Sequence, residues 1–138
     1  MVDSPDGTIS DLGEFGLIQR ITAGAGAAKA VILGPGDDTA IVAAPDGRVV
    51  ITTDLMVEGR HFRRDWSTPI DVGRKAAAAS LADVAAMGAV PTALVVGLAA
   101  PGDLPVTWAV ACTAGLTQEA ALVGAVIVGG DVVAAEMI

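Results

Sequence analysis

Three carboxylates stand out in the first half of the chain. Two of them are adjacent in the glycine-bracketed turn Gly34-Pro35-Gly36-Asp37-Asp38, and the third, Asp54, follows the apolar run 49–53. Adjacent like charges repel, and a fold that brings a third acid nearby increases that repulsion. A divalent cation removes the cost, because Mg²⁺ prefers oxygen ligands and commonly bridges carboxylates to substrate phosphates. The pattern predicts a metal site, although an ordinary acidic turn accounts for the Asp37–Asp38 pair equally well.

Apolar runs and turn signals predict the order β-β-β-α-β-α-β. Thr68 followed by Pro69 is typical of a helix start, and Gly88 of its end, so a helix is expected over 68–87. The turn 44–47 predicts a hairpin between 39–43 and 48–53, and the apolar run 49–51 predicts burial on both faces. The remaining expected elements are strands at 30–33, 92–98 and 125–128 and a helix at 105–123. The fold class is therefore α/β, with two layers: a mixed sheet and helices on one face.

The chain has 138 residues and a net charge of −8, which suits one domain of acidic character. We expect residues 1–12 to form a flexible leader and residues 13–138 the domain. The acidic balance argues against nucleic acid and anionic membranes as partners. The single cysteine, Cys112, is expected to be a buried thiol, and the polar residues 1–10 favour a cytoplasmic location.

Two further acids are candidates for the metal site. Asp131 follows the expected strand 125–128, and the carboxyl ends of strands commonly face one crevice in α/β sheets. Asp83 lies near the end of the expected helix, where the helix dipole is negative and an acid is unfavourable. Apolar neighbours suggest that Asp83 is partly buried beside a cation, and a solvent-facing aspartate is the alternative. Gly129 and Gly130 allow close approach of a phosphate, although a plain turn would also use them.

The basic residues gather around the only histidine. His61 lies among Arg60, Arg63 and Arg64 in an otherwise acidic chain. Such a cluster can hold a substrate phosphate by charge-assisted hydrogen bonds. A solvated basic loop is the alternative.

Taken together, the sequence blocks resemble bacterial thiamine-monophosphate kinase, of the superfamily of aminoimidazole ribonucleotide synthetase and selenophosphate synthetase. The resemblance covers about residues 13–131, and the combination of blocks carries it. The blocks are Gly13-Glu14-Phe15-x-Leu17-Ile18, Gly36-Asp37-Asp38-x-Ala40, Thr52-Thr53-Asp54-x-Met56-Val57-x-Gly59-x-His61-Phe62, Leu81-x-Asp83-x-Ala85-Ala86-Met87-Gly88-Ala89 and Gly129-Gly130-Asp131.

This resemblance implies a function, a cofactor and a set of site residues. It implies ATP-dependent phosphorylation of thiamine monophosphate to thiamine diphosphate, with several Mg²⁺ ions around the ATP phosphates. It also implies the N-terminal domain of the aminoimidazole ribonucleotide synthetase-like fold and a homodimer. Gly130 and Asp131 match ATP contacts, His61 matches a substrate contact, and Asp37 is a further acid of the same motif. The matched metal ligands are Asp38, Thr52, Thr53, Asp54, Asp83 and Asp131.

The chain departs from the family pattern in three respects. Ser80-Leu81-Ala82-Asp83 stands where Asn-Leu-Ser-Asp is common, which removes two polar groups near the metal, and Val132 replaces a threonine. The family's second α/β domain is absent, so a fragment that is inactive alone is expected. Another enzyme of the superfamily with a different phosphate acceptor, and a non-catalytic nucleotide-binding or dimerisation module, are the alternatives.

Overall fold

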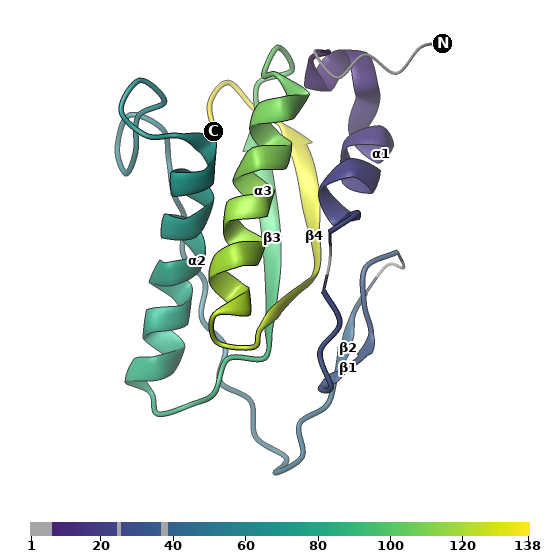
Figure 1. Ribbon diagram of the computed structural model, residues 1–138, viewed down its shortest axis with the longest axis vertical. Coiled ribbons are helices and arrows are strands. Elements are labelled where there is room, and N and C mark those ends of the chain that lie inside the picture. The colour runs from purple at the N-terminus through teal and green to yellow at the C-terminus, as the bar shows by residue number, and fades with distance from the viewer. Residues whose placement is uncertain (1–6, 25, 37–38) are drawn as a thin grey trace.

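The computed structural model describes residues 7–24, 26–36 and 39–138. Three helices lie over one face of a parallel strand pair, and a short hairpin stands beside them (Figure 1). The elements are α1 (Ile9–Thr22), β1 (Val31–Leu33), β2 (Ile41–Val42), α2 (Pro69–Ala86), β3 (Ala93–Ala100), α3 (Val106–Ala121) and β4 (Val126–Ala134). The α/β class is confirmed. The described strands form two separate pairs, β1–β2 and β3–β4, in place of one mixed sheet.

Helix α2 begins and ends where the sequence predicts. The Thr68 hydroxyl accepts a hydrogen bond from the Asp71 amide at 3.2 Å, and the Asp71 carboxylate accepts from the Thr68 amide at 3.2 Å. This reciprocal capping box satisfies two amides that the first turn leaves without partners. At the other end Gly88 adopts φ +69°, a conformation that glycine takes without strain.

Helices α2 and α3 touch backbone to backbone. A Cβ atom on Gly73 of α2 would lie 1.9 Å from the Cys112 carbonyl oxygen, and one on Gly115 of α3 would lie 2.2 Å from the Ile70 carbonyl oxygen. Glycine at both positions therefore permits the close crossing, because any side chain would push the helices apart. The crossing fixes α2 relative to the strands beneath α3.

Strands β3 and β4 are parallel and joined by α3. Leu94 and Leu98 pack against the helices, so the alternation of a strand turns Val95 to the opposite face, where it is 74% exposed. Strand β4 runs to Ala134, six residues beyond its predicted end at Val128. Asp131 therefore lies within β4, opposite Gly97 of β3, and does not close the strand as expected.

The segment 48–53 corrects a second expectation. The turn at 44–47 forms, with the Gly47 amide donating to the Ala44 carbonyl oxygen at 3.0 Å, but no third strand follows it. Strand β2 instead pairs with β1. Val49 and Ile51 are 70% and 86% exposed, so the predicted burial on both faces is wrong. An apolar, β-branched run becomes a strand only where a partner offers its backbone, and none of the described strands pairs with 48–53.

Helix α1 begins inside the expected leader. Thr8 and Asp11 form a capping box like that of α2, and Gly13, with φ +75°, bends the helix after its first turn. Leu17 is fully buried against α3 and β4, whereas Phe15 is 84% exposed.

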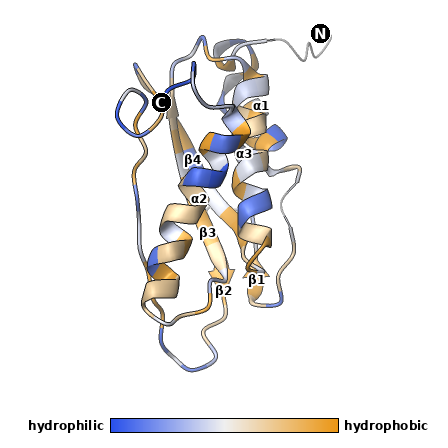
Figure 2. Cartoon of the chain, turned by 60° about the vertical axis from the view of Figure 1, so that its left-hand side comes forward, coloured by the Kyte–Doolittle hydropathy of each residue, from blue (hydrophilic) through white to orange (hydrophobic). Residues whose placement is uncertain are grey.

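Residues 1–6 lie outside the described part of the chain. Figure 2 shows apolar colour along β1 and β3. None of the described helices is long and apolar enough to cross a membrane.

Candidate metal and nucleotide site

Two hydrogen bonds join the extended segment 48–57 to helix α2. The Thr52 hydroxyl donates to Asp83 Oδ2 at 3.1 Å, and the Ser80 hydroxyl donates to Asp54 Oδ2 at 2.8 Å. Thr52 and Asp54 belong to the segment, and Ser80 and Asp83 belong to α2. Each element thus supplies one hydroxyl and one carboxylate to the other.

The spacing of these four residues explains the arrangement. Positions two apart on an extended chain point the same way, about 7 Å apart, and positions three apart on a helix share a face about 4.5 Å apart along the axis. Thr52 and Asp54 therefore face α2 together, and Ser80 and Asp83 face the segment together. Because Thr52 meets Asp83 and Asp54 meets Ser80, the segment runs antiparallel to α2.

Asp83 lies in the last turn of α2, where the helix dipole is negative. That turn contains no basic residue. The expectation that Asp83 is partly buried is wrong: its side chain is exposed, and the neighbouring Met87 is 72% exposed. A neutral hydroxyl is its recorded partner. The carboxylate oxygens of Asp83 and Asp54 are hard donors of the kind that Mg²⁺ prefers.

The other predicted ligands do not join this pair in the described part of the chain. Asp131 is exposed on β4, and its Oδ1 accepts from the Val132 amide at 2.9 Å. Thr53 is also exposed. Asp37 and Asp38 lie outside the described residues. Among the residues described, no three acids, histidines or cysteines are placed to hold a metal ion, so the convergence of four acids stays a prediction.

Gly130 has a structural explanation besides the predicted nucleotide contact. A Cβ atom there would lie 1.9 Å from the Val96 carbonyl oxygen of β3. The pairing shifts register between Leu94 and Val95, close to this point. Only glycine therefore fits the close approach of the two strands, whether or not a phosphate binds nearby.

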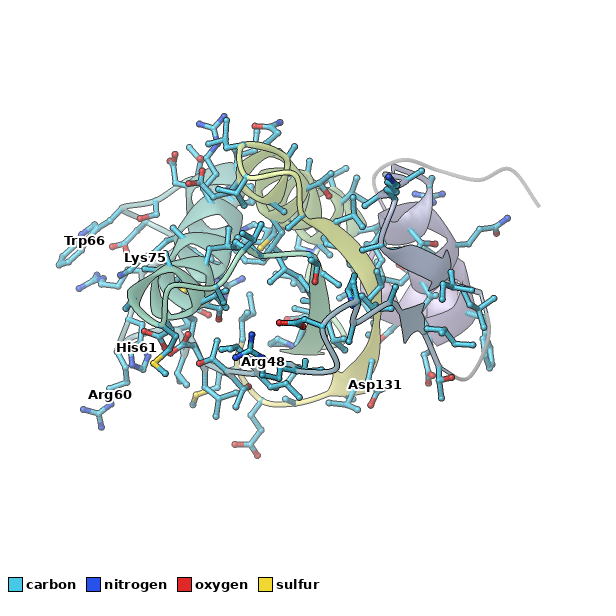
Figure 3. All side chains as sticks on the ribbon, turned by 90° about the horizontal axis from the view of Figure 1, so that it is seen from below. Arg48, Arg60, His61, Trp66, Lys75 and Asp131 are labelled. Carbon is cyan, nitrogen blue, oxygen red and sulfur yellow. The ribbon has the colours of Figure 1, made fainter. Side chains whose placement is uncertain are left out.

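Two arginines of the basic cluster pair with carboxylates of their own segment. Arg63 bonds Asp65 at 2.6 Å and lowers the pKa of that carboxyl, and Arg64 bonds Glu58 at 2.6 Å. His61 is exposed, and its Nδ1 accepts from the Val57 amide at 3.0 Å. With Nδ1 accepting, Nε2 is the ring nitrogen that can donate to another group. Figure 3 shows His61 and Asp131 on opposite sides of the domain, so the structure does not bring these two candidates together.

Ser80 was not among the predicted site residues. It stands where asparagine is common in the family, and its hydroxyl keeps a polar contact there by donating to Asp54. The signal was present in the spacing, because Ser80 lies three residues before Asp83 on the same helix face.

Comparison with known proteins places the chain in a family. The sequence profile described as AIR synthase related protein, N-terminal domain, matches residues 36–138. The thiamine-monophosphate kinase of Mycobacterium tuberculosis is 53% identical over 126 residues, covering 91% of this chain and 38% of that protein. That of Corynebacterium glutamicum is 42% identical over 127 residues, covering 91% and 37%.

A solved structure agrees with these matches. The crystal structure of thiamine-monophosphate kinase from Stenotrophomonas maltophilia K279a superposes with a TM-score of 0.70 at 28% identity, covering 88% of this chain and 37% of that one. The chain therefore spans less than two fifths of the length of these relatives. The resemblance seen in the sequence is confirmed, and the chain belongs to the family of AIR synthase related proteins, whose N-terminal domain it matches.

Proposed function

We propose that this chain is the Mg-ATP-binding part of a thiamine-monophosphate kinase, which transfers a phosphoryl group from ATP to thiamine monophosphate. The observation that carries the proposal is the meeting of Asp54 and Asp83, from separate elements, through Ser80 and Thr52. Two carboxylates held by neutral hydroxyls form the kind of site that attracts a hard cation. The names of the relatives support the kinase assignment, and their greater length makes the activity of the whole protein part of the proposal.

The residues of this chain would bind and orient the reactants. Asp54 and Asp83, with Thr52, Thr53, Asp38 and Asp131, would supply oxygen ligands to magnesium. When bound, Mg²⁺ neutralises phosphate charge and aligns the transferred group, which is most of what phosphoryl transfer requires. Gly130 and Asp131 would contact ATP. His61 would donate from Nε2 to the substrate, because Nδ1 is occupied by the Val57 amide.

The proposal also includes a homodimer and a cytoplasmic location. The face of β3 turned away from the helices carries the exposed Val95, and on β4 the exposed Val133 adds to the apolar surface. An apolar sheet face of this kind suits contact with a second copy. A non-catalytic nucleotide-binding and dimerisation module remains the second candidate, because the chain matches only 38% of the length of its relatives.

Ligand-dependent melting of the Asp83→Asn variant tests the metal site. In chelator, we expect the variant to melt like the unsubstituted chain or slightly higher, because a charge leaves the negative helix end. Mg²⁺ with a non-hydrolysable ATP analogue should raise the melting temperature of the unsubstituted chain by linkage, and much less that of the variant. In a longer protein that also carries the remainder found in relatives, Asp83→Asn should remove most thiamine diphosphate formation.

Three results would count against the proposal. Identical melts of the unsubstituted chain with and without ligand would remove the nucleotide site from this domain. Normal activity of the longer Asp83→Asn protein would remove Asp83 from the site. A strongly destabilised variant in chelator would make Asp83 a structural hydrogen-bonding residue instead.

A further inference from the structure

We infer that Ser80 is a positioning residue for Asp54, and that Thr52 does the same for Asp83, so that both carboxylates are oriented before a cation arrives. The inference rests on the proposed metal site and adds to it a residue, Ser80, that the family resemblance does not assign. Its basis is the reciprocal pair of hydrogen bonds between the segment 48–57 and α2.

The segment has little else to hold it in place. Within the described residues, its stretch from Val49 to Leu55 forms no strand and no recorded backbone hydrogen bond. Ile51 and Leu55 are 86% and 83% exposed, so apolar burial contributes little there. Its next residue, Met56, packs beside Phe62, Val72 and Cys112. Among the described residues, the two hydroxyl–carboxylate hydrogen bonds are therefore the side-chain contacts that orient Asp54 and Asp83 relative to one another.

Each tie uses one oxygen of its carboxylate. Thr52 donates to Oδ2 of Asp83, and Ser80 donates to Oδ2 of Asp54. No described residue is recorded as donating to Oδ1 of either acid, so one oxygen of each is available to a cation while the other anchors the side chain. An anchored ligand loses less rotational freedom on binding than a free one.

The chemistry of the donors also matters. A hydroxyl is neutral, so it orients a carboxylate without cancelling the charge that attracts Mg²⁺. At two other carboxylates arginine is the donor instead, Arg63 at Asp65 and Arg64 at Glu58. An ion pair of that kind would compete with a metal ion. Serine at position 80 therefore suits a metal-holding carboxylate.

The experiment compares Mn²⁺ binding to four forms of the chain in the presence of a non-hydrolysable ATP analogue, using the electron paramagnetic resonance signal of free Mn²⁺. The forms are the unsubstituted chain, Ser80→Ala, Ser80→Thr and the control Thr117→Ala. Thr117 donates only to the Thr113 carbonyl oxygen in α3, so its loss removes a hydroxyl away from the acids. Melts in chelator check that every form folds.

We expect Ser80→Ala to bind Mn²⁺ about tenfold more weakly, as is typical when a partner of a metal ligand is lost. Ser80→Thr keeps the hydroxyl and should restore most of the affinity, and Thr117→Ala should bind normally. A purely structural role would instead lower the chelator melt of Ser80→Ala and leave its Mn²⁺ affinity unchanged.

The outcomes separate this inference from the proposed function. Normal Mn²⁺ binding by Ser80→Ala, or equal weakening in Ser80→Ala and Thr117→Ala, would overturn the role of Ser80 and leave the metal site standing. Failure of Ser80→Thr to recover affinity would also overturn it. Absence of Mn²⁺ binding by the unsubstituted chain would overturn the metal site and the positioning role together.

Discussion

At the scale of single residues, Ser and Thr hydroxyls donate hydrogen bonds to carboxylates, a role that basic side chains often take in other proteins. The sequence has 16 acidic residues and 8 Lys or Arg, so many carboxylates must find neutral partners. Among the aspartates that the structure describes, four accept from a Ser or Thr hydroxyl: Asp11 from Thr8, Asp71 from Thr68, Asp83 from Thr52, and Asp54 from Ser80. At Asp11 and Asp71 these bonds also lower the pKa of the carboxyl. The two capping pairs were readable from local sequence, whereas the two at the candidate site depend on distant segments.

Cys112 gives a pH-dependent prediction at this scale. Burial raises the pKa of its thiol from 9.0 to about 11. The thiolate therefore favours the unfolded chain: the stabilising effect is fully present below about pH 9 and is lost as the pH rises to 11. Between these pH values the unsubstituted chain should lose about 2 to 3 kcal/mol more unfolding free energy than Cys112→Ala, which has no thiol to ionise. Urea unfolding at pH 8 and pH 11 measures it, and equal losses in both proteins would contradict it.

At the scale of elements, α2, α3 and the four strands β1 to β4 were predictable, whereas the start of α1, the length of β4 and the lack of a strand at 48–53 were not. The start of α2 depends on Thr68 and Pro69, and its end on Gly88, all of which act within a few residues. A strand depends on a partner that the local sequence does not name, so 48–53 was placed in a hairpin that β1 occupies instead. For the same reason β4 continues through Gly129 and Gly130, because β3 extends alongside them.

The crossing of α2 and α3 is tested by Gly73→Ala. Alanine has the better helix propensity by about 1 kcal/mol, which alone would stabilise α2. The new Cβ atom would lie 1.9 Å from the Cys112 carbonyl oxygen, however, and that oxygen belongs to helix backbone that cannot move aside cheaply. We expect a net loss of about 3 kcal/mol or more in unfolding free energy.

Gly24→Ala is the matched control, because no atom lies within 4 Å of a Cβ there. It should change the unfolding free energy by less than about 1 kcal/mol in either direction. Chemical denaturation of the three proteins makes the comparison. If Gly73→Ala were as stable as the control, the helices would not be in backbone contact.

At the scale of the whole molecule, the helices cover one face of β3–β4 and the other face is open (Figure 1). On the open side Val95 is 74% exposed, and Gly97 beside it has no atom within 4 Å of a Cβ position. Val133 of β4 adds apolar surface on the same side, next to the exposed Asp131, and exposed apolar side chains of this kind can mark a contact with another protein. The proposed second copy is the simplest partner, because it requires nothing but this chain.

Val95→Lys tests that contact. If the open face is the dimer interface, a lysine at position 95 should convert a dimer to a monomer, since burial would remove water from its ammonium group. Leu122→Lys, at the end of α3, replaces a residue of similar exposure, 76%, on another part of the surface and should leave the dimer intact. Light scattering coupled to size-exclusion chromatography distinguishes the two states. Dissociation by Leu122→Lys, or an intact Val95→Lys dimer, would place the interface elsewhere.

The antiparallel contact between segment 48–57 and α2 also sets an order of events during synthesis. Asp54 leaves the ribosome before its partner Ser80 does, because 26 residues separate them along the chain. At roughly 5 to 20 residues per second, the segment then waits on the order of one to several seconds without the helix that orients it. During that interval Val49, Val50 and Ile51 have no α2 beside them and are targets for a chaperone. The carboxylates of the candidate site can therefore come together only after α2 has left the ribosome, so the rate of translation sets the earliest time at which the site forms.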